Sequence, residues 1–504
     1  MPNLPEVRRP AKQPLFTANE WTFERLEAVD RACAHVAEDD LRLDTYSNQI
    51  EVISAEQMLD AYTSVGLPVF YPHWSFGKQR AIETGRYRRG EMGLAYELVI
   101  NSNPCISYLL EENTMTMQTL VIAHAAYGHN AFFKNNVFFQ QWTDADGILD
   151  YLLFAKRYIR ECEERYGFSE VARVLDAAHS LSANGIDHAR RPGKLSAKEE
   201  EEQRRSREAF LEQQLSDLWR TIPVGPEQST FVLEETQPLF PPAPEENLLY
   251  FLEKNAPKLE TWKREILRIV RKVSQYLYPQ SQTKIMNEGF ACFTHYFIMH
   301  RLHEQGWLTD GTMLEFYASH TAVTAQPSFR SPHYSGINPY ALGFAIFQDI
   351  RRICLHPTDE DRAWFPFAGD PDWVSQIHFA MREFRDDSFV LQYLSPKVIR
   401  DLRLFAIHQD GEEDDHFLVT AIQDDTGVRA VRESLARQIT ALNRAPDIQI
   451  VRVDRLGDRT LEMVQVDPQP LDTEDTDRTL LHFHYLWGYP VRFFGAGGKE
   501  WSVP

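Results

Sequence analysis

The sequence is poor in cysteine and has no long apolar run. Its five cysteines, in a chain of 504 residues, are odd in number and never form a CxxC pair. This excludes a disulfide framework and a zinc site built on paired thiolates. No stretch approaches the roughly 18 consecutive apolar residues that a membrane-spanning helix needs. Residues 1–14 also lack the apolar segment of a secretory signal, so we expect a cytoplasmic protein without a membrane span.

The sequence is also short of positive charge. Lysine and arginine number 53 against 73 aspartates and glutamates, which gives a formal net charge of −20 at pH 7. Because nucleic acids and anionic lipids attract a positive surface, we expect neither as the main partner. The motifs GxxxxGKS/T, GxGxxG and GxSxG are absent as well. Nucleotide hydrolysis, dinucleotide binding and serine-hydrolase chemistry therefore lack support.

The spacing of apolar residues predicts an α+β protein. Up to about residue 400 the spacing is helical, interrupted at about 189–247 by a charged run and a proline-rich connector. From residue 401 to 504, alternating segments predict a small ββαββα domain. We thus predict two domains, 1–400 and 401–504. The tail segments are the strands Leu402–His408 and Phe417–Gln423, the helix Val428–Leu442, the strands Ile448–Asp454 and Thr460–Val466, the helix Asp475–Trp487 and a last strand, Val491–Phe494.

Two histidines, His124 and His129, lie five residues apart on one long predicted helix. Histidines on a helix are the usual helical contribution to a zinc site, and the HExxH motif spaces them by four. A spacing of five separates two side chains by about 140° on an α-helix. The histidines therefore converge only if the helix carries a π-bulge or loosens near Gly128. Ala125 stands where HExxH holds its general-base glutamate. Two core or capping histidines are the alternative interpretation.

A later predicted helix supplies further metal-binding residue types. Glu288 and His295 are seven residues apart, which is about −20° on a helical wheel, so they share one face with Cys292 between them. A glutamate from a separate helix is the third ligand that a site with two histidines requires. We predict zinc or another divalent metal bound by His124, His129 and Glu288, with His295 in reserve. Alternatively, Glu288 stabilises a helix dipole from the first turn.

Candidate catalytic groups are the carboxylates Glu97, on a predicted short strand, and Glu112, just before the histidine helix. Either could replace the missing general base, because that role needs a position and a tuned pKa rather than a fixed place in the sequence. Each is otherwise an ordinary capping or surface residue. His320 is a further histidine that could face the same cavity. A lysine and two carboxamides after His129 could clamp an anionic or amide-rich ligand, or simply end the helix. These are Lys134, Asn135 and Asn136.

Four stretches of the chain resemble the SpoVR family, the stage V sporulation protein R group. They are AYELVINSNPCISYLLEENT, VIAHAAYGHNAFFKNN, QTKIMNEGFACFTHY and SPHYSGINPYALGFAIFQDI. The resemblance runs from about Trp21 to Phe494, and the C-terminal part is similar to that of proteobacterial members. It implies a role in spore cortex and peptidoglycan formation, or in starvation and stress responses. It also implies a PrkA-type serine kinase and a von Willebrand-type protein as partners.

Two classes of function remain open. The first is a metal-dependent hydrolase with a zincin-like, mainly α-helical N-terminal domain. Three candidate ligands of residue types that bind metals favour this class. The second is a non-catalytic regulatory or scaffold protein with a degenerate metal site, which Ala125 favours. If the first holds, His124, His129 and Glu288 converge on one cavity. We then expect Asn287, Glu97 or Glu112 to hold the outer imidazole nitrogens.

Overall fold

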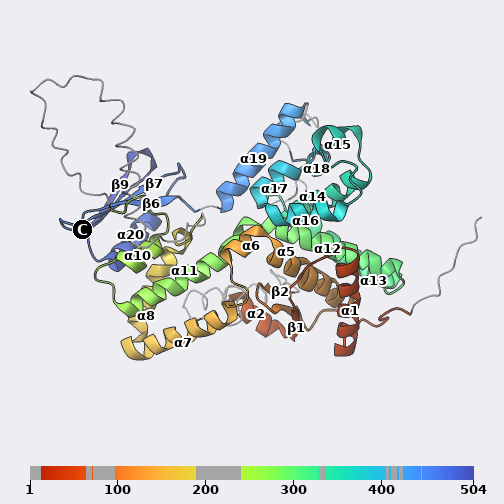
Figure 1. Ribbon diagram of the computed structural model, residues 1–504, viewed down its shortest axis with the longest axis horizontal. Helices are drawn as coiled ribbons and strands as arrows, with labels where there is room; N and C mark the ends of the chain where they lie inside the picture. Colours follow the sequence, from red (N-terminus) through yellow and green to blue (C-terminus); the bar gives the residue numbers. More distant parts are fainter. Residues whose placement is uncertain are drawn as a thin grey trace, which may run out of the picture. The chain divides into compact units, whose positions relative to one another are not determined.

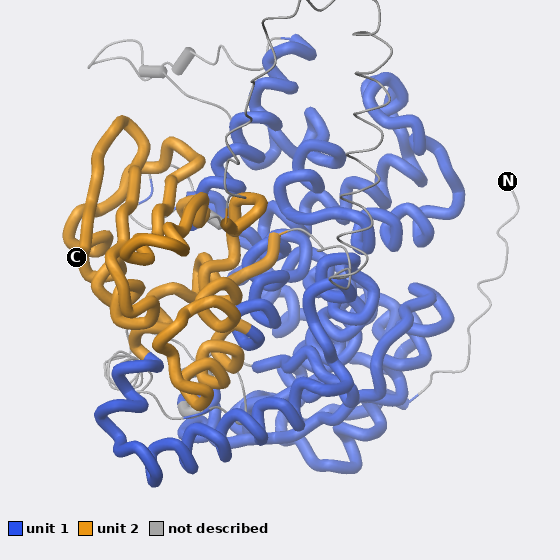
Figure 2. Tube along the Cα trace, turned by 60° about the vertical axis from the view of Figure 1, so that its left-hand side comes forward, with its two compact units in different colours: residues 1–175, 272–445 blue, residues 176–271, 446–504 orange. Residues whose placement is uncertain are grey.

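The chain forms two compact units. The computed structural model describes residues 13–63, 71, 97–188, 240–327, 331, 336–404, 408–409, 417–418, 424–443 and 445–504. Unit 1 comprises Met1–Leu175 and Lys272–Ala445, and unit 2 comprises Asp176–Arg271 and Pro446–Pro504 (Figure 2). The domain division predicted at residue 400 stays a prediction, and most of the insertion predicted at 189–247 lies outside the described residues. Among the helices of the described ranges, none is long and apolar enough to cross a membrane.

Helices make up most of unit 1 (Figure 1), as the sequence predicts. Helix α1 (Phe23–Asp39) is typical: it begins after Thr22, whose side chain accepts a hydrogen bond from Arg25 N. Its buried residues recur at a spacing of three or four, so that one stripe faces the core. The other helices in unit 1 or crossing its boundaries are α2 (Ala55–Thr63), α6 (Val137–Trp142), α7 (Ile148–Tyr166), α8 (Phe168–Ser180), α11 (Thr261–Gln282), α15 (Asp359–Trp364), α16 (Trp373–Glu383), α17 (Asp386–Tyr393), α18 (Pro396–Asp401) and α19 (Asp425–Asn443).

A small sheet in unit 1 carries one of the candidate residues. Its central strand, β3 (Cys105–Leu110), is parallel to β1 (Asn48–Ile53) and antiparallel to β2 (Glu97–Ile100). Glu97 is the first residue of β2 and pairs with Leu109, so the register of the sheet fixes its position. The short strand predicted to carry Glu97 is confirmed as β2. Both β2 and β3 contact the helical segment that contains the two histidines.

Helix α12 packs against two other helical segments of unit 1, η1 and α14. Small residues allow the close approach on both sides. A Cβ added at Gly128 of η1 would lie 2.7 Å from Ala291 Cα, and one added at Gly289 would lie 2.4 Å from Gly343 Cα of α14. The helix is therefore held at short range against both neighbours. The helical segments that pack together around α12 are α4 (Met115–Val121), η1 (Ile122–His129), α5 (Asn130–Asn135), α12 itself (Lys284–Glu304), α13 (Asp310–Thr324) and α14 (Pro339–Leu355).

Unit 2 contains a four-stranded sheet with the order β6-β7-β8-β9. Strands β7 and β8 are parallel and are joined through helix α20, which buries Phe483 and Trp487. The tail elements follow in the predicted order ββαββα, with β8 as the predicted last strand and β9 in addition. The start of the first predicted strand, Leu402–His408, was wrong, because residues 402–403 form a turn directly after α18 and the strand residues described are His408–Gln409. The first two tail strands, β4 (His408–Gln409) and β5 (Phe417–Leu418), lie in unit 1. The elements of unit 2 are η2 (Ser182–Asn184), α10 (Leu248–Asn255), β6 (Ile448–Val453), β7 (Leu461–Gln465), α20 (Thr473–Trp487), β8 (Val491–Phe494), η3 (Ala496–Gly498) and β9 (Glu500–Val503).

Helix α19 follows β5 in the tail but packs within unit 1. Its residues Val428, Leu435 and Ile439 are buried in the same core as Phe389 of α17. Arg432 adds a hydrogen bond to a carbonyl of that unit and lies over the ring of Trp364, 4.6 Å from the centroid. The apolar stripe of α19 is therefore buried within unit 1.

Asp361 in the first turn of α15 supports a prediction about acid stability. Its buried carboxylate accepts two hydrogen bonds from Arg352, at 2.7 and 2.8 Å, and closes a capping box with Thr358. Although burial alone would raise it, these donors lower the pKa of Asp361 to about 2. A carboxyl with a lowered pKa in the folded state adds stability above its usual pKa, and that stability is lost as the pH falls from about 4 to about 2.

We expect Asp361→Asn to lower the free energy of unfolding of unit 1 by about 2 kcal/mol at pH 7. The difference from the parent chain should shrink as the pH falls toward 2, since the parent then loses the same interaction. Differential scanning calorimetry of both chains between pH 2.5 and 7 measures it. Asp359→Asn, at an exposed position in the same turn, is the matched control. Equal transition midpoints for the two variants would contradict this assignment.

Candidate metal centre

Both histidines lie on a π-helical segment, with His129 as its last residue. Residues Ile122–His129 form the π-helix η1, which continues α4 and runs on into α5. A π-helix bonds residue i to residue i+5, so side chains five residues apart stack on one face. The imidazole rings of His124 and His129 accordingly lie 4.6 Å apart between centroids. The π-bulge that the spacing of five demanded is confirmed.

Glu288 approaches both histidines from α12. Its Oε2 lies 3.7 Å from Nε2 of His124 and 3.5 Å from Nε2 of His129. The close packing of Gly128 against Ala291 brings α12 near enough for this contact. The structure therefore brings together all three residues predicted as the primary metal ligands.

Glu97 completes the group from the sheet. Its Oε1 lies 3.2 Å from Nε2 of His124, and ligand atoms of Glu97, His124 and His129 all lie within 4.8 Å of one another. The side chains of the two histidines are 5% and 9% exposed, whereas those of Glu97 and Glu288 are 21% and 19% exposed. We call these four residues the carboxylate–histidine centre. Its imidazoles are buried, and its carboxylates stand closer to solvent.

The four groups of the centre have opposed pKa shifts. Burial, reinforced by the charge of Glu288, raises the pKa of Glu97 to about 7, against the opposing effect of His124. Burial also acts on Glu288, but its hydrogen bond with His124 and the nearby His129 lower the pKa of this carboxyl. His129 is driven to a pKa of about 4, chiefly by burial. His124 has a raised pKa, because Glu97, Cys292 and Glu288 outweigh the effect of burial. The centre thus combines a neutral imidazole, a carboxylate and a carboxyl that titrates near neutrality.

An amide fixes the orientation of one imidazole. His129 Nδ1 lies 2.9 Å from Oδ1 of Asn287, and an amide oxygen only accepts hydrogen bonds. Nδ1 therefore carries the proton, and the lone pair of Nε2 points toward Glu288. Histidines that bind metals are typically held in this way through their other nitrogen. The expectation that Asn287 holds an outer imidazole nitrogen is confirmed.

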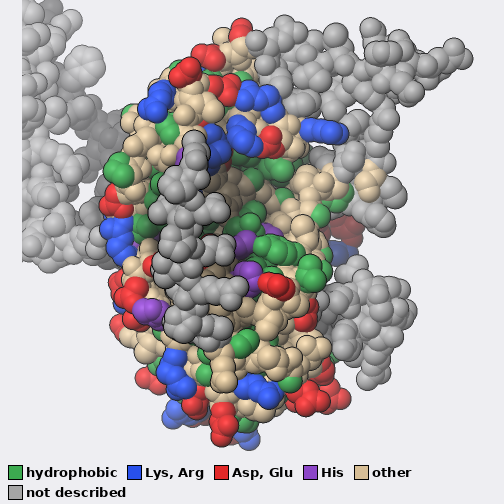
Figure 3. Space-filling view, turned by 90° about the vertical axis from the view of Figure 1, so that its right-hand side faces the viewer, with side chains coloured by type: hydrophobic (Ala, Val, Ile, Leu, Met, Phe, Trp, Pro, Cys, Tyr) green, Lys and Arg blue, Asp and Glu red, His purple; other side chains and the backbone are tan. Residues whose placement is uncertain are grey.

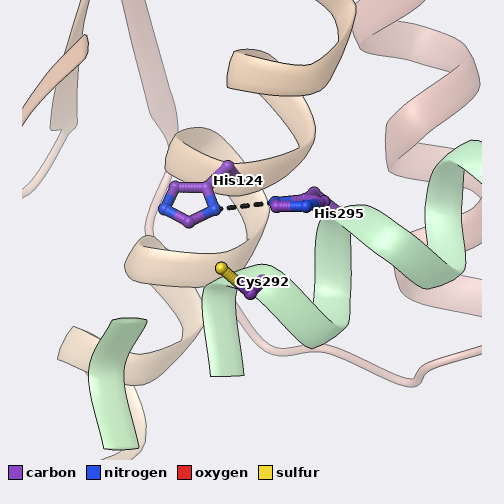
Figure 4. Close-up of side chains that lie close together, drawn as sticks. All are labelled: His124, Cys292 and His295. Carbon is purple, nitrogen blue, oxygen red and sulfur yellow. Dashed lines mark hydrogen bonds between the residues drawn. The ribbon is translucent and has the colours of Figure 1, made fainter. Parts of the chain in front are cut away.

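Beyond His124 the histidines form a hydrogen-bonded row. His124 Nδ1 lies 2.8 Å from His295 Nδ1, and His295 Nε2 lies 2.8 Å from His320 Nδ1. Cys292, one helical turn before His295 on α12, points at the same place (Figure 4), and ligand atoms of His124, Cys292 and His295 lie within 4.8 Å of one another. His295, predicted as a reserve ligand, is thus next to the centre, on the other side of the His124 ring.

Tyr340 is a functional candidate that the sequence alone did not single out. It lies in the first turn of α14, where Asn338 caps the helix by accepting from Tyr340 N. The Tyr340 hydroxyl hydrogen-bonds Glu288 and contributes to the lowered pKa of that carboxylate. Burial and the carboxylates of Glu288 and Glu97 raise the pKa of Tyr340 itself, so the hydroxyl stays protonated and can donate. The aromatic residue directly after Asn-Pro was the available signal.

Several predicted residues are not part of the centre. Glu112 is exposed in the turn between β3 and α4. Lys134 donates to Asp44 Oδ1 at 2.6 Å, Asn135 donates to the carbonyl of the same residue at 2.7 Å, and Asn136 donates to Met381 O at 2.8 Å. These contacts tie α5 to its neighbours and favour a structural role over the ligand clamp predicted for Lys134, Asn135 and Asn136.

Histidines also occur outside the centre. On the face shown in Figure 3, histidine side chains lie among hydrophobic ones, with charged side chains around them. His300 and His303 of α12 are half-buried and pair with Tyr317 and Asp310, at 3.2 and 2.8 Å. The presence of histidines therefore does not by itself define the centre. What defines it is the contacts that two of them, in η1, make with Glu97 and Glu288.

The fold and the site together define a mainly helical α+β protein with a buried carboxylate–histidine centre on a π-helix. A family model described as "SpoVR like protein" matches residues 20–444, and one described as "SpoVR-like C-terminal domain" matches residues 446–495. The chain belongs to the SpoVR family, which confirms the resemblance. The boundary between the two matches coincides with the end of unit 1 at Ala445.

The comparisons also place the chain beside a curated relative. It is 55% identical over 475 residues to "Uncharacterized protein YcgB" of Escherichia coli (strain K12). The match covers 94% of this chain and 92% of that protein. No solved structure matches the chain. The family is therefore established from sequence, and the chemistry has to be argued from the centre.

Proposed function

We propose that the chain is a metal-dependent hydrolase that works in the cytoplasm. His124, His129 and Glu288 would hold zinc or another divalent cation, and Glu97 would act as the general base. The observation that carries the proposal is the convergence of two imidazoles and two carboxylates from β2, η1 and α12 within one buried group. The π-helix makes this convergence at a histidine spacing that a regular α-helix forbids.

The donor set suits a catalytic zinc ion. Two imidazole nitrogens and one carboxylate oxygen are a common ligand set of catalytic zinc, and they leave a coordination position open. His129 is neutral with its Nε2 lone pair free, and Asn287 holds the opposite nitrogen. When bound, such an ion supplies an activated water and polarises the carbonyl under attack. This arrangement is the zincin-like feature that we propose for the N-terminal domain.

Glu97 takes the role that Ala125 leaves vacant. It approaches the ligand His124 from the sheet rather than from the histidine helix. A general base works best with a pKa near the working pH, and the pKa of Glu97 of about 7 meets that condition. Its carboxylate would accept a proton from the attacking water and return it to the leaving amine. Tyr340 would hold Glu288 ionised and in place through its hydroxyl.

The family membership bears on the substrate. The role in spore cortex and stress response implied by the family suggests a cell-wall peptide or its cytoplasmic precursor as the substrate. Both contain amide bonds, which a metal centre with a carboxylate base can hydrolyse. We further propose the PrkA-type serine kinase and the von Willebrand-type protein as partners in that response.

The proposal predicts separate effects of Glu97 on catalysis and on metal binding. We expect Glu97→Gln to keep its zinc and to lower kcat on muropeptide stem peptides by about 10²–10⁴-fold, because the amide cannot accept the proton. Hydrolysis by the zinc-loaded full chain is followed by mass spectrometry, and metal content by elemental analysis. Glu112→Gln, at the exposed candidate carboxylate, is the matched control and should keep the parent rate. Loss of zinc from Glu97→Gln would make Glu97 a ligand instead of the base.

A regulatory or scaffold role is the second candidate. One observation favours it: Ala125 is fully buried in the histidine segment, at the position where HExxH carries its base. In that case the ion would hold β2, η1 and α12 together, and the acidic chain would act through a bound partner. A zinc-loaded chain that hydrolyses no stem peptide, and that melts at a lower temperature once the zinc is chelated, would favour this role over catalysis.

A further inference from the structure

We propose that His124, Cys292 and His295 form a second metal site beside the carboxylate–histidine centre. We call these three residues the thiolate site. It would take a divalent cation that prefers sulfur and nitrogen ligands, zinc above all, and it would share His124 with the centre. The inference rests on the proposed function, because it extends the proposed metal centre from one ion to two.

The geometry of α12 aims two of the three ligands at one place. Cys292 and His295 are three residues apart on this helix, which puts them on one face a single turn apart. His124 reaches the same place from η1, and Figure 4 shows the thiol and both imidazoles gathered there. One ligand atom from each residue lies within 4.8 Å of the others, and all three side chains are buried. A cysteine thiolate and a histidine imidazole are both ligands that zinc takes in proteins.

The two nitrogens of His124 serve different neighbours. Nε2 lies 3.2 Å from the carboxylate of Glu97, and Nδ1 lies 2.8 Å from Nδ1 of His295. Without metal, a proton on each nitrogen satisfies both contacts: one donates to the carboxylate and the other to the lone pair of His295. Each proton therefore stands where a cation can replace it. One ring then connects the carboxylate–histidine centre to the thiolate site.

The proton balance allows a second ion. A cation entering the thiolate site displaces the Nδ1 proton of His124 and the thiol proton of Cys292. Two protons leave and one divalent cation arrives, so the net charge of the buried group does not change. An uncompensated charge in such a place would be costly, and this exchange creates none. The released protons pass to solvent.

His320 prepares His295 for this role. His295 Nε2 lies 2.8 Å from His320 Nδ1. If Nδ1 of His295 accepts a hydrogen bond from His124, the proton of the His295 ring must sit on its Nε2 atom. That nitrogen then donates a hydrogen bond to His320. The lone pair of His295 Nδ1 then faces the thiolate site, and His320 is the outer partner that orients a metal-binding imidazole. Among the cysteines, all of which lie in described parts of the chain, only Cys292 shares a group of metal-binding side chains with histidines.

Cobalt(II) tests the proposal, since cobalt bound to a thiolate absorbs strongly in the near ultraviolet and cobalt bound only to nitrogen and oxygen does not. The metal-free full-length chain is titrated with Co²⁺ alone, followed by absorbance and by elemental analysis after desalting. We expect two cobalt ions per chain and a thiolate-to-cobalt band. Cys292→Ala should bind one ion and lose the band. Cys354→Ala, at another buried cysteine, should keep both ions and the band.

Further variants separate the two sites. His129→Ala should lose one ion and keep the band, because His129 belongs only to the carboxylate–histidine centre. Loss of the band in that variant would overturn a separate thiolate site. A parent chain that binds one ion without a thiolate band would overturn the thiolate site and leave the proposed function standing. A parent that binds no cobalt would contradict both. Cys292→Ser, with circular dichroism, replaces Cys292→Ala if the alanine variant does not fold.

Discussion

The His129→Ala variant is expected to lose one equivalent of zinc relative to the parent chain, with the affinity of the carboxylate–histidine centre falling at least about 100-fold. Even the loss of an outer partner of a metal-binding histidine costs 10–100-fold in affinity, and His129 is proposed as a direct ligand. Its Nε2 lies 3.5 Å from Glu288 Oε2, with the lone pair exposed to the centre. Competition with a chromophoric chelator and elemental analysis measure the effect.

His303→Ala is the control for this loss. His303 lies on α12, as Glu288 does, but is half-buried and pairs with Asp310 away from the centre. Its replacement should leave zinc content and affinity as they are in the parent. If both variants bound zinc like the parent, the carboxylate–histidine centre would not be a metal site, and the proposed metal-dependent hydrolase would be ruled out.

Gly343→Ala is expected to destabilise unit 1 by about 3 kcal/mol or more, since overpacking a close-packed contact typically costs 1–3 kcal/mol and sometimes more. A Cβ at this position would lie 2.0 Å from the carbonyl oxygen of Ile285 and 2.8 Å from Gly289 Cα. Both are backbone atoms of α12, which cannot rotate away as a side chain can. The thermal unfolding midpoint of unit 1 in calorimetry measures the loss.

Gly311→Ala provides the matched comparison. Gly311 lies in the first turn of α13, and the nearest atom to an added Cβ is 3.7 Å away. Alanine there should be neutral or stabilising by up to about 1 kcal/mol, because it reduces the freedom of the unfolded chain. In Gly343→Ala, α12 also has to shift relative to η1, so zinc affinity should fall together with stability. A Gly343→Ala chain that melts like the parent would show that the two helices are less closely packed than the structure has them.

The sequence predicted the part of the centre that depends on local geometry. The spacing of His124 and His129 already required a π-bulge, because helical angles allow no other convergence, and the structure has the π-helix η1 there. Glu288 followed from its residue type and from its face on the second helix. Asn287, the next residue, was a natural outer partner and is one. Each of these inferences needed only a helical wheel and the chemistry of metal ligands.

The rest of the centre depends on packing between distant segments. Glu97 and Glu112 were equal candidates in the sequence, and only the pairing of β2 with β3 brings Glu97 beside His124. Tyr340 reaches Glu288 because α14 packs closely on α12 at paired glycines. A single sequence contains no such distances. For the same reason the tail helix α19 was predicted correctly as a helix, while its packing in unit 1 was not foreseen.

The π-helix also fixes a rotational phase. An α-helix bonds residue i to i+4 and a π-helix bonds i to i+5, so η1 amounts to a regular helix with one residue inserted. The same residues wound as a regular α-helix would turn His129 and everything after it by about 100° relative to His124. The first residue after the pair is Asn130, whose buried amide accepts a hydrogen bond from Tyr46 N at 2.8 Å and donates one to Tyr46 O at 2.9 Å. The π-helix thus sets the histidine pair and the docking of α5 together, and rewinding it would lose both.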